Sequence, residues 1–131
     1  MEDTLRELKN KLNPGDREVV GGILGRIGDK WSVMALVILS KKPRRFTELL
    51  DTIPGISRRM LTVTLRQLER DGLIERRVHA DVPPWFEYAV TELGLSLHTP
   101  ITAFFEWAIT HRDEIVAHRE NYDTSQTSSV R

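Results

Sequence analysis

The chain has 131 residues, 40% of them hydrophobic and 29% charged, which suits one compact domain and excludes a chain that is disordered by composition. Its 19 Lys and Arg residues balance 19 Asp and Glu residues, which excludes a uniformly basic nucleic-acid coat and an acidic tail protein. The absence of Cys excludes disulfide scaffolds, zinc ribbons, thiolate catalysis and thiol redox sensing.

Two helices are predicted in the first 28 residues. Asp3 can cap a helix over residues 4–12, which places Leu5, Leu8 and Leu12 on one stripe. A Pro-Gly pair then breaks the chain. Asp16 can cap a second helix that runs to about Ile27, and each of its glycines weakens it by roughly 1 kcal/mol relative to Ala. This second helix therefore needs tertiary packing.

A helix-turn-helix is predicted in the middle of the chain. The apolar segment 31–39 favours a buried helix, although its β-branched residues are also compatible with a strand. A short helix over 46–53 and a Pro-Gly turn follow. Ser57 then stands at the N-cap of a longer helix over 58–71, and Gly72 ends this helix. The buried stripe of the longer helix consists of Leu61, Leu65 and Leu68.

A two-stranded hairpin is predicted next, with strands over 73–79 and 85–90. The residues between them include two prolines, which cannot continue a central strand and so mark the tip. Thr91 can cap a final helical region, which Pro100 should kink or split. The Ser- and Thr-rich segment 121–131 has little to bury, and we expect it to be a disordered tail.

This order of elements predicts the fold class. It is mostly α (α+β): a winged helix-turn-helix with a two-stranded β-wing and with dimerisation helices at about 1–13 and 92–119. We expect residues 1–120 to form this single domain. No signal peptide or membrane span is evident, so we expect a cytoplasmic protein that does not bind membranes.

The balanced charge hides a basic middle segment. Residues 41–79 hold ten basic side chains against five acidic ones, whereas residues 80–131 hold three against eight. Charge alone fits a solvated surface with ordinary Arg–Glu pairs as well as it fits a surface that faces a polyanion. The position of the basic residues favours DNA, because the N-terminal half of a recognition helix over 57–71 would enter the major groove.

The candidate DNA-binding residues come from three parts of this motif. They precede the short helix, cover the outward face of the recognition helix, where Arg can pair with guanine, and occupy the first wing strand. The full set is Lys41, Lys42, Arg44, Arg45, Ser57, Arg58, Arg59, Thr62, Arg66, Arg76, Arg77 and His79.

Five spaced motifs resemble the HxlR-type winged-helix transcriptional regulators. The first is Ile27-Gly28-Asp29-Lys30-Trp31, and the others lie within residues 43–49, 54–62, 65–74 and 82–94. The resemblance covers about residues 17–107. It implies a homodimeric DNA-binding protein whose dimer contacts come from its N- and C-terminal helices. It also implies a relation to MarR-type regulators and control of nearby genes.

Two positions depart from the family pattern. Many members carry a Cys upstream of the first motif, where this chain has residues 16–20 without one, so its regulation must use something other than a thiol. The wing commonly has Arg or Lys after its Pro-Pro pair, where this chain has Trp85. Trp85 puts a minor-groove contact in doubt, and packing against the wing root or a partner is the alternative.

A homodimer is expected because one winged helix covers only one half-site of a symmetric operator. We therefore expect double-stranded DNA with an inverted repeat and a second copy of the chain as partners. The predicted dimer interface consists of apolar residues from the first and last helices that the local fold does not need: Leu5, Leu8, Leu12, Ile101, Phe105 and Ile109.

Other functions have weaker support. A winged helix that binds protein should expose apolar rather than basic residues on the recognition helix. An enzyme is not expected, because no catalytic triad, phosphate loop or dinucleotide fingerprint is present. We expect no cofactor and no metal site, and read His111, Glu114 and His118 as a solvated helix face. A small-molecule effector in a pocket near the dimer helices stays open.

Overall fold

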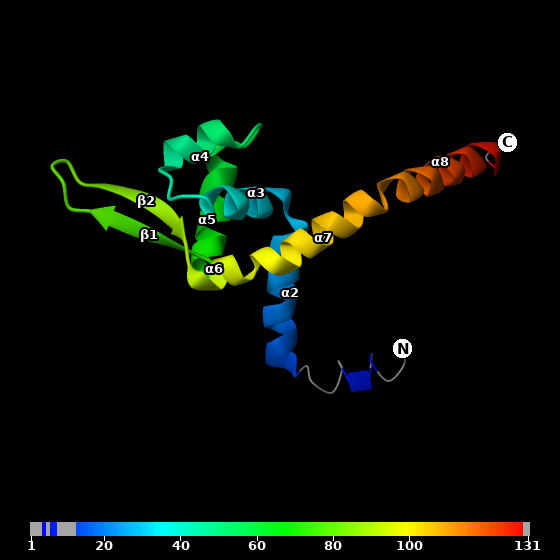
Figure 1. Ribbon diagram of the computed structural model, residues 1–131, viewed down its shortest axis with the longest axis horizontal. Coiled ribbons are helices and arrows are strands. Elements are labelled where there is room, and N and C mark those ends of the chain that lie inside the picture. The colour runs from blue at the N-terminus through cyan, green and yellow to red at the C-terminus, as the bar shows by residue number, and fades with distance from the viewer. Residues whose placement is uncertain (1–3, 5, 8–12, 130–131) are drawn as a thin grey trace. The chain divides into compact units, whose positions relative to one another are not determined.

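The computed structural model describes residues 4, 6, 7 and 13–129 (Figure 1). The chain forms two compact units, residues 1–96 and 97–131. Of the predicted first helix, Thr4, Arg6 and Glu7 are helical, and Leu5, Leu8 and Leu12 lie outside the described residues. No helix in the described ranges is long and apolar enough to cross a membrane.

The first well-defined helix, α2 (Pro14–Gly28), begins earlier than predicted. Its N-cap is Asn13 rather than Asp16. The Asn13 side chain accepts a hydrogen bond from the Asp16 backbone N–H at 2.8 Å, and the Asp16 carboxylate accepts one from the Asn13 N–H at 3.3 Å. This reciprocal capping box satisfies two N–H groups that a helix start leaves free. Asp16 therefore completes the cap that Asn13 makes.

The core of the first unit forms around α3 (Lys30–Leu39), which contacts α2, α5 and β2. Asp29 caps α3 by accepting from the Trp31 N–H at 3.2 Å and from the Ser32 hydroxyl at 2.8 Å. The α3 side chains Val33, Ala35, Leu36 and Leu39 are buried. The segment 31–39 therefore forms the predicted buried helix and not the alternative strand.

The helix-turn-helix consists of α4 (Phe46–Thr52) and α5 (Arg58–Arg70). Gly55 turns the chain between them at φ 79°, a backbone conformation that favours glycine. The Ser57 hydroxyl caps α5 by accepting from the Met60 N–H at 3.0 Å, and Gly72 ends it at φ 76°, as predicted. Leu61, Leu65 and Leu68 are almost completely buried, so the predicted inward stripe is confirmed.

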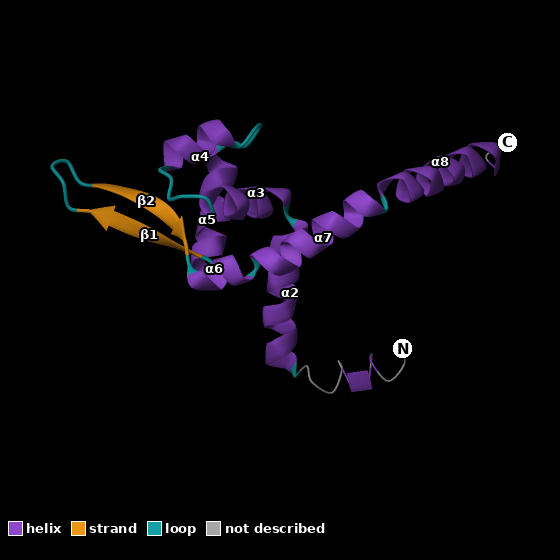
Figure 2. Ribbon diagram, viewed as in Figure 1, coloured by secondary structure: helices purple, strands orange, loops and turns teal. Residues whose placement is uncertain are grey.

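Strands β1 (Ile74–His79) and β2 (Trp85–Val90) pair antiparallel and form the wing, as predicted (Figure 2). Arg76 stands opposite Tyr88, and Arg77 stands opposite Glu87. An isolated bridge adds Arg44 on the other side of β2: its N–H donates to the Tyr88 carbonyl at 2.9 Å, and the Tyr88 N–H donates back at 2.8 Å. The segment before α4 is therefore tied to the wing by backbone hydrogen bonds.

An ion pair connects α2 with the end of α5. Arg26 Nε donates to the Asp71 carboxylate at 2.8 Å, and both side chains are about four-fifths buried. Asp71 is also the C-cap residue of α5. The pair lines a hollow of about 330 Å³ between the two helices.

Helix α6 (Glu92–Ser96) follows the wing closely. The Thr91 hydroxyl donates to the Gly72 carbonyl at 2.6 Å and accepts from the Gly94 N–H at 3.1 Å. Thr91 therefore caps α6, as predicted, and joins it to the end of α5. The packing at Gly94 is tight, because a Cβ there would overlap the Leu73 carbonyl oxygen and approach Val90 Cγ2 to 2.7 Å.

Gly94→Ala is expected to destabilise the protein by about 1–3 kcal/mol, because the Leu73 backbone cannot easily retreat from the added methyl group. Denaturant unfolding measures this change. Gly25→Ala in α2 is the matched control, since nothing lies within 4 Å of its Cβ position and the better helix former stabilises by up to about 1 kcal/mol. Equal stabilities for the two variants would contradict the close approach at Gly94.

The second unit contains α7 (His98–Thr110) and α8 (Arg112–Ser129). Pro100 lies in the first turn of α7, and it has no N–H to donate to the Ser96 carbonyl, so the helical region divides where the sequence predicted. The tail predicted over 121–131 differs from the structure, in which α8 continues to Ser129. The sequence after Pro100 contains no Gly or Pro that would end the helix earlier.

Candidate nucleic-acid interface

The outward face of α5 carries cationic side chains without partners. Arg58, Arg59 and Arg66 are exposed, and none of these guanidinium groups forms an ion pair within the described ranges. The helix N-terminus adds free N–H groups and a positive dipole end near Arg58 and Arg59. The Thr62 hydroxyl donates to the Arg58 carbonyl at 2.9 Å, which leaves its methyl group and an acceptor lone pair for other contacts. This face suits an anionic surface.

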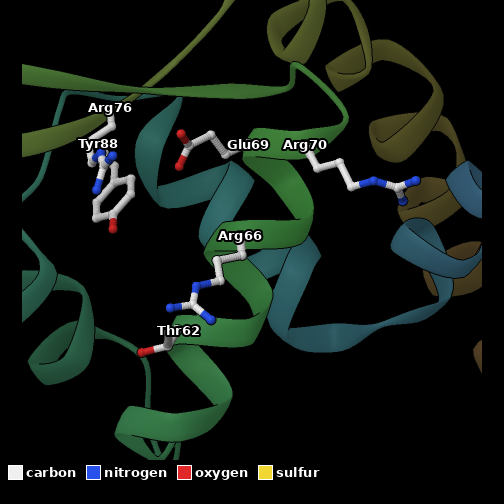
Figure 3. A pocket seen from close by; sticks show the side chains of 6 residues that line it. All are labelled: Thr62, Arg66, Glu69, Arg70, Arg76 and Tyr88. Atoms are coloured by element: carbon white, nitrogen blue, oxygen red, sulfur yellow. The ribbon is translucent and has the colours of Figure 1, made fainter.

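A groove lies between α5 and the wing, and we call it the α5–wing groove (Figure 3). Its volume is about 590 Å³, and its lining side chains are Thr62, Arg66, Glu69, Arg70, Arg76 and Tyr88. The lining therefore includes three Arg side chains and one Glu, and Figure 3 shows the Arg70 side chain extending away from the other labelled side chains. Burial raises the pKa of the Tyr88 hydroxyl above its ordinary value, although Arg76 opposes the shift. The hydroxyl therefore stays protonated at neutral pH and can donate a hydrogen bond.

The two faces of the wing hold different groups, because residues directly opposite in an antiparallel pair share a face and neighbours alternate. Arg76 and Tyr88 share the face that lines the α5–wing groove. Arg77 alternates to the other face, where its Nε donates to Glu75 Oε1 at 2.8 Å. His79 lies there too, with Nε2 at 3.0 Å from Glu87 Oε1. The predicted wing residues therefore do not form one cluster.

Trp85 packs within the wing. Its indole stacks on the His79 ring with centroids 3.9 Å apart, and its Nε1 donates to Asp81 Oδ2 at 2.5 Å. The Arg45 guanidinium lies 3.9 Å from the Trp85 ring centroid. The sequence left open packing against the wing root or a partner, whereas the structure shows Trp85 packed against His79 and Arg45 at the tip end of the strand pair.

The four basic residues before α4 also separate. Lys41 and Lys42 are exposed and border a hollow of about 200 Å³ that Arg77 also lines. The Arg45 guanidinium lies over the Trp85 ring, as described above. Arg44 is bound to Tyr88 through its backbone, and its buried Nε has no hydrogen-bond partner in the described part of the chain. The structure therefore brings Lys41 and Lys42 near Arg77 and Arg44 near Tyr88.

Sequence reasoning did not identify Tyr88 or Arg70 as site residues. The sequence places Tyr88 in the strand predicted over 85–90 and gives it no role in binding. The register of the predicted hairpin could have identified Tyr88, because a tip at Pro83 and Pro84 places Tyr88 opposite Arg76. Arg70 lies near the C-terminal end of α5, whereas the sequence prediction considered only the N-terminal half of this helix for DNA contacts.

The residues predicted for a dimer interface are described only in part. Phe105 and Ile109 are exposed on α7, at 44% and 73%, and Ile101 is buried. These three follow one another at four-residue spacing and so share one face of α7. Between α7 and α8, the His111 Nδ1–H donates to the Trp107 carbonyl at 2.8 Å. No group of three potential metal ligands lies close together among the described residues.

Comparison with known proteins gives one family. The HxlR-like helix-turn-helix pattern matches residues 26–116. The HTH-type transcriptional regulator YdeP of Bacillus subtilis strain 168 is 43% identical over 89 residues, which span 68% of this chain and 70% of YdeP. The reduced form of the transcriptional regulator YodB from B. subtilis superposes with a TM-score of 0.64 at 30% identity and covers 74% of this chain and 91% of YodB.

A second solved structure extends the comparison beyond that family pattern. A transcriptional regulator of the MarR family from Enterococcus faecalis V583 superposes with a TM-score of 0.68 at 27% identity. The alignment covers 82% of this chain and 96% of that protein.

Proposed function

The chain belongs to the HxlR-like helix-turn-helix family, and from this premise we propose that it is a transcriptional regulator that binds specific DNA sequences as a homodimer. Its relatives are transcriptional regulators rather than enzymes. The observation that carries the proposal is the set of unpaired guanidinium groups on the outward, N-terminal half of α5. In helix-turn-helix proteins this half of the recognition helix contacts bases in the major groove.

The residues divide into two roles in this proposal. Arg58, Arg59 and Thr62 contact base edges, because Arg pairs with guanine and Thr offers a methyl group and a hydroxyl. Phosphate contacts, which position the protein without reading sequence, come from the other basic and hydroxyl residues. These are Lys41, Lys42, Arg44, Arg45, Ser57, Arg66, Arg76, Arg77 and His79.

The test is selection of bound genomic fragments with the purified full chain. A homodimer should recover an inverted repeat whose half-sites are centred about one helical turn apart or a multiple of that distance. Recovery of fragments without a shared sequence would contradict specific binding. An asymmetric single site would contradict the homodimer while leaving DNA recognition intact. Since the chain has no Cys, binding should not respond to thiol oxidants.

Lys41 and Lys42 are expected to contribute salt-dependent affinity. Replacing either residue with Ala should flatten the slope of log K against log salt by about 0.9 for each phosphate contact that is lost, with similar loss on operator and random DNA. Titrations at several salt concentrations measure the slope. Arg119→Ala on α8 is the matched control outside the proposed contacts. Unchanged slopes for both lysine variants would place this pair away from DNA.

A further inference from the structure

Tyr88 is a buried polar residue that the free protein does not use. Its side chain is only 9% exposed, yet its hydroxyl forms no hydrogen bond within the described ranges. Its backbone is fixed on both sides, by Arg44 and by the strand partner Arg76. The hydroxyl oxygen is not among the buried polar atoms that lack a partner, so it opens into the α5–wing groove and is available to donate to an external acceptor.

The surroundings of this hydroxyl are suited to an anion. Figure 3 shows the Tyr88 hydroxyl pointing into the α5–wing groove, toward the side where Arg66 lies, with Arg76 beside the ring. Neither Arg66 nor Arg76 forms an ion pair with any described residue. Glu69 also lines the groove and offsets one of its three cationic side chains. The remaining positive charge and the O–H donor match an oxygen-rich anion.

A second unsatisfied donor lies on the same face of the wing. Arg44 pairs directly with Tyr88 across the isolated bridge, and directly opposed residues share a face. The buried Nε of Arg44 has no partner in the described part of the chain. The Arg44 Nε and the Tyr88 hydroxyl, on two directly paired residues, therefore both lack a hydrogen-bond acceptor among the described residues.

We propose that the α5–wing groove seats one backbone phosphate of bound DNA, with the Tyr88 hydroxyl donating a hydrogen bond to it between the guanidinium groups of Arg66 and Arg76. This inference rests on the proposed DNA binding and adds a residue to it. The groove is continuous with the base-contacting face of α5, because Thr62 belongs to both. A phosphate held here fixes the register of the recognition helix on the duplex.

Tyr88→Phe tests the proposal, because it retains the ring and removes only the donor. Operator affinity should fall about tenfold or more, as expected for a hydrogen bond to a charged group. The slope of log K against log salt should stay unchanged, since no charge is removed. Arg76→Gln should lower the affinity and also flatten the slope by about 0.9. Tyr122→Phe on α8, whose side chain is exposed, is the control and should bind like wild type.

Two further readouts separate this role from a structural one. Unfolding of Tyr88→Phe in denaturant should match wild type, because the hydroxyl has no described partner in the free protein. Methylphosphonate substitution, one phosphate at a time, should find a position in each half-site that weakens wild type and has less effect on Tyr88→Phe. Such non-additivity identifies the phosphate that Tyr88 contacts.

Each outcome decides the proposal. If Tyr88→Phe binds operator as tightly as wild type at every salt concentration, the proposed phosphate contact of Tyr88 is wrong, although the proposed DNA binding is unaffected. Equal sensitivity of the two proteins at every methylphosphonate position would overturn it as well. A wild-type protein that binds no DNA would overturn the proposed function, and this inference with it.

Discussion

Phe105→Glu is expected to convert the protein to a monomer and to abolish operator binding. Phe105 shares one face of α7 with Ile109, and both are exposed in the single chain. We expect a second copy of the chain to cover these exposed apolar side chains. Because a symmetric dimer uses the same patch twice, one substitution introduces two carboxylates into the interface. An isolated winged helix can contact only one half-site, so the monomer should lose the combined affinity that operator binding needs.

Sedimentation at micromolar concentration, together with operator titration, tests this result. Tyr122→Glu places the same charge at an exposed aromatic residue on α8, outside the predicted interface, and should leave the dimer intact. Wild-type protein that sediments as a monomer would contradict the dimer. A Phe105→Glu variant that remains dimeric and binds operator would show that a different surface holds the two copies together.

Arg58→Ala and Arg59→Ala are expected to lower operator affinity by about 5- to 150-fold each, the range that corresponds to loss of one bidentate base contact. Both side chains are exposed and unpaired, so their removal should not disturb the fold. Affinity for random DNA should fall much less than affinity for the operator, because a base contact carries sequence information and a phosphate contact does not.

Measurement of both affinities at one salt concentration separates these effects. Arg17→Ala on α2 removes the same charge from an exposed residue outside the proposed contacts and serves as the control. If both variants bind operator as tightly as wild type, α5 is not the recognition helix. Equal losses on operator and random DNA would instead reassign Arg58 and Arg59 to phosphate contacts.

The recognition helix and wing were predictable because local chemistry determines them. Ser57 at the N-cap, Gly72 at the helix end and two prolines at the hairpin tip each specify backbone geometry within a few residues. The cap of α2 was misassigned because Asn13 and Asp16 are both good capping residues, and only the structure shows that they act as a reciprocal pair.

The grouping of the basic residues was not predictable in the same way. Arg76 and Arg77 are adjacent in the sequence, but strand alternation places them on opposite faces of the wing. Arg45 is held by Trp85, a residue 40 positions later in the chain. Tyr88 gained significance only through its bridge to Arg44 and its position in the groove. Such relations depend on tertiary structure, which charge counts along a sequence do not contain.

The ion pair between Arg26 and Asp71 couples two properties of the protein: the orientation of α2 and the stability of the last turn of α5. Asp71 places a carboxylate at the C-terminus of a helix, where the dipole already carries partial negative charge, and Arg26 offsets it. Moving α2 out of this contact would take the Arg26 charge away from Asp71. The Asp71 carboxylate would then stand uncompensated at the negative end of the helix dipole, which would favour fraying of the α5 end that carries Arg70. An effector that repositions α2 would therefore act on the DNA-binding helix without touching its base-contacting residues.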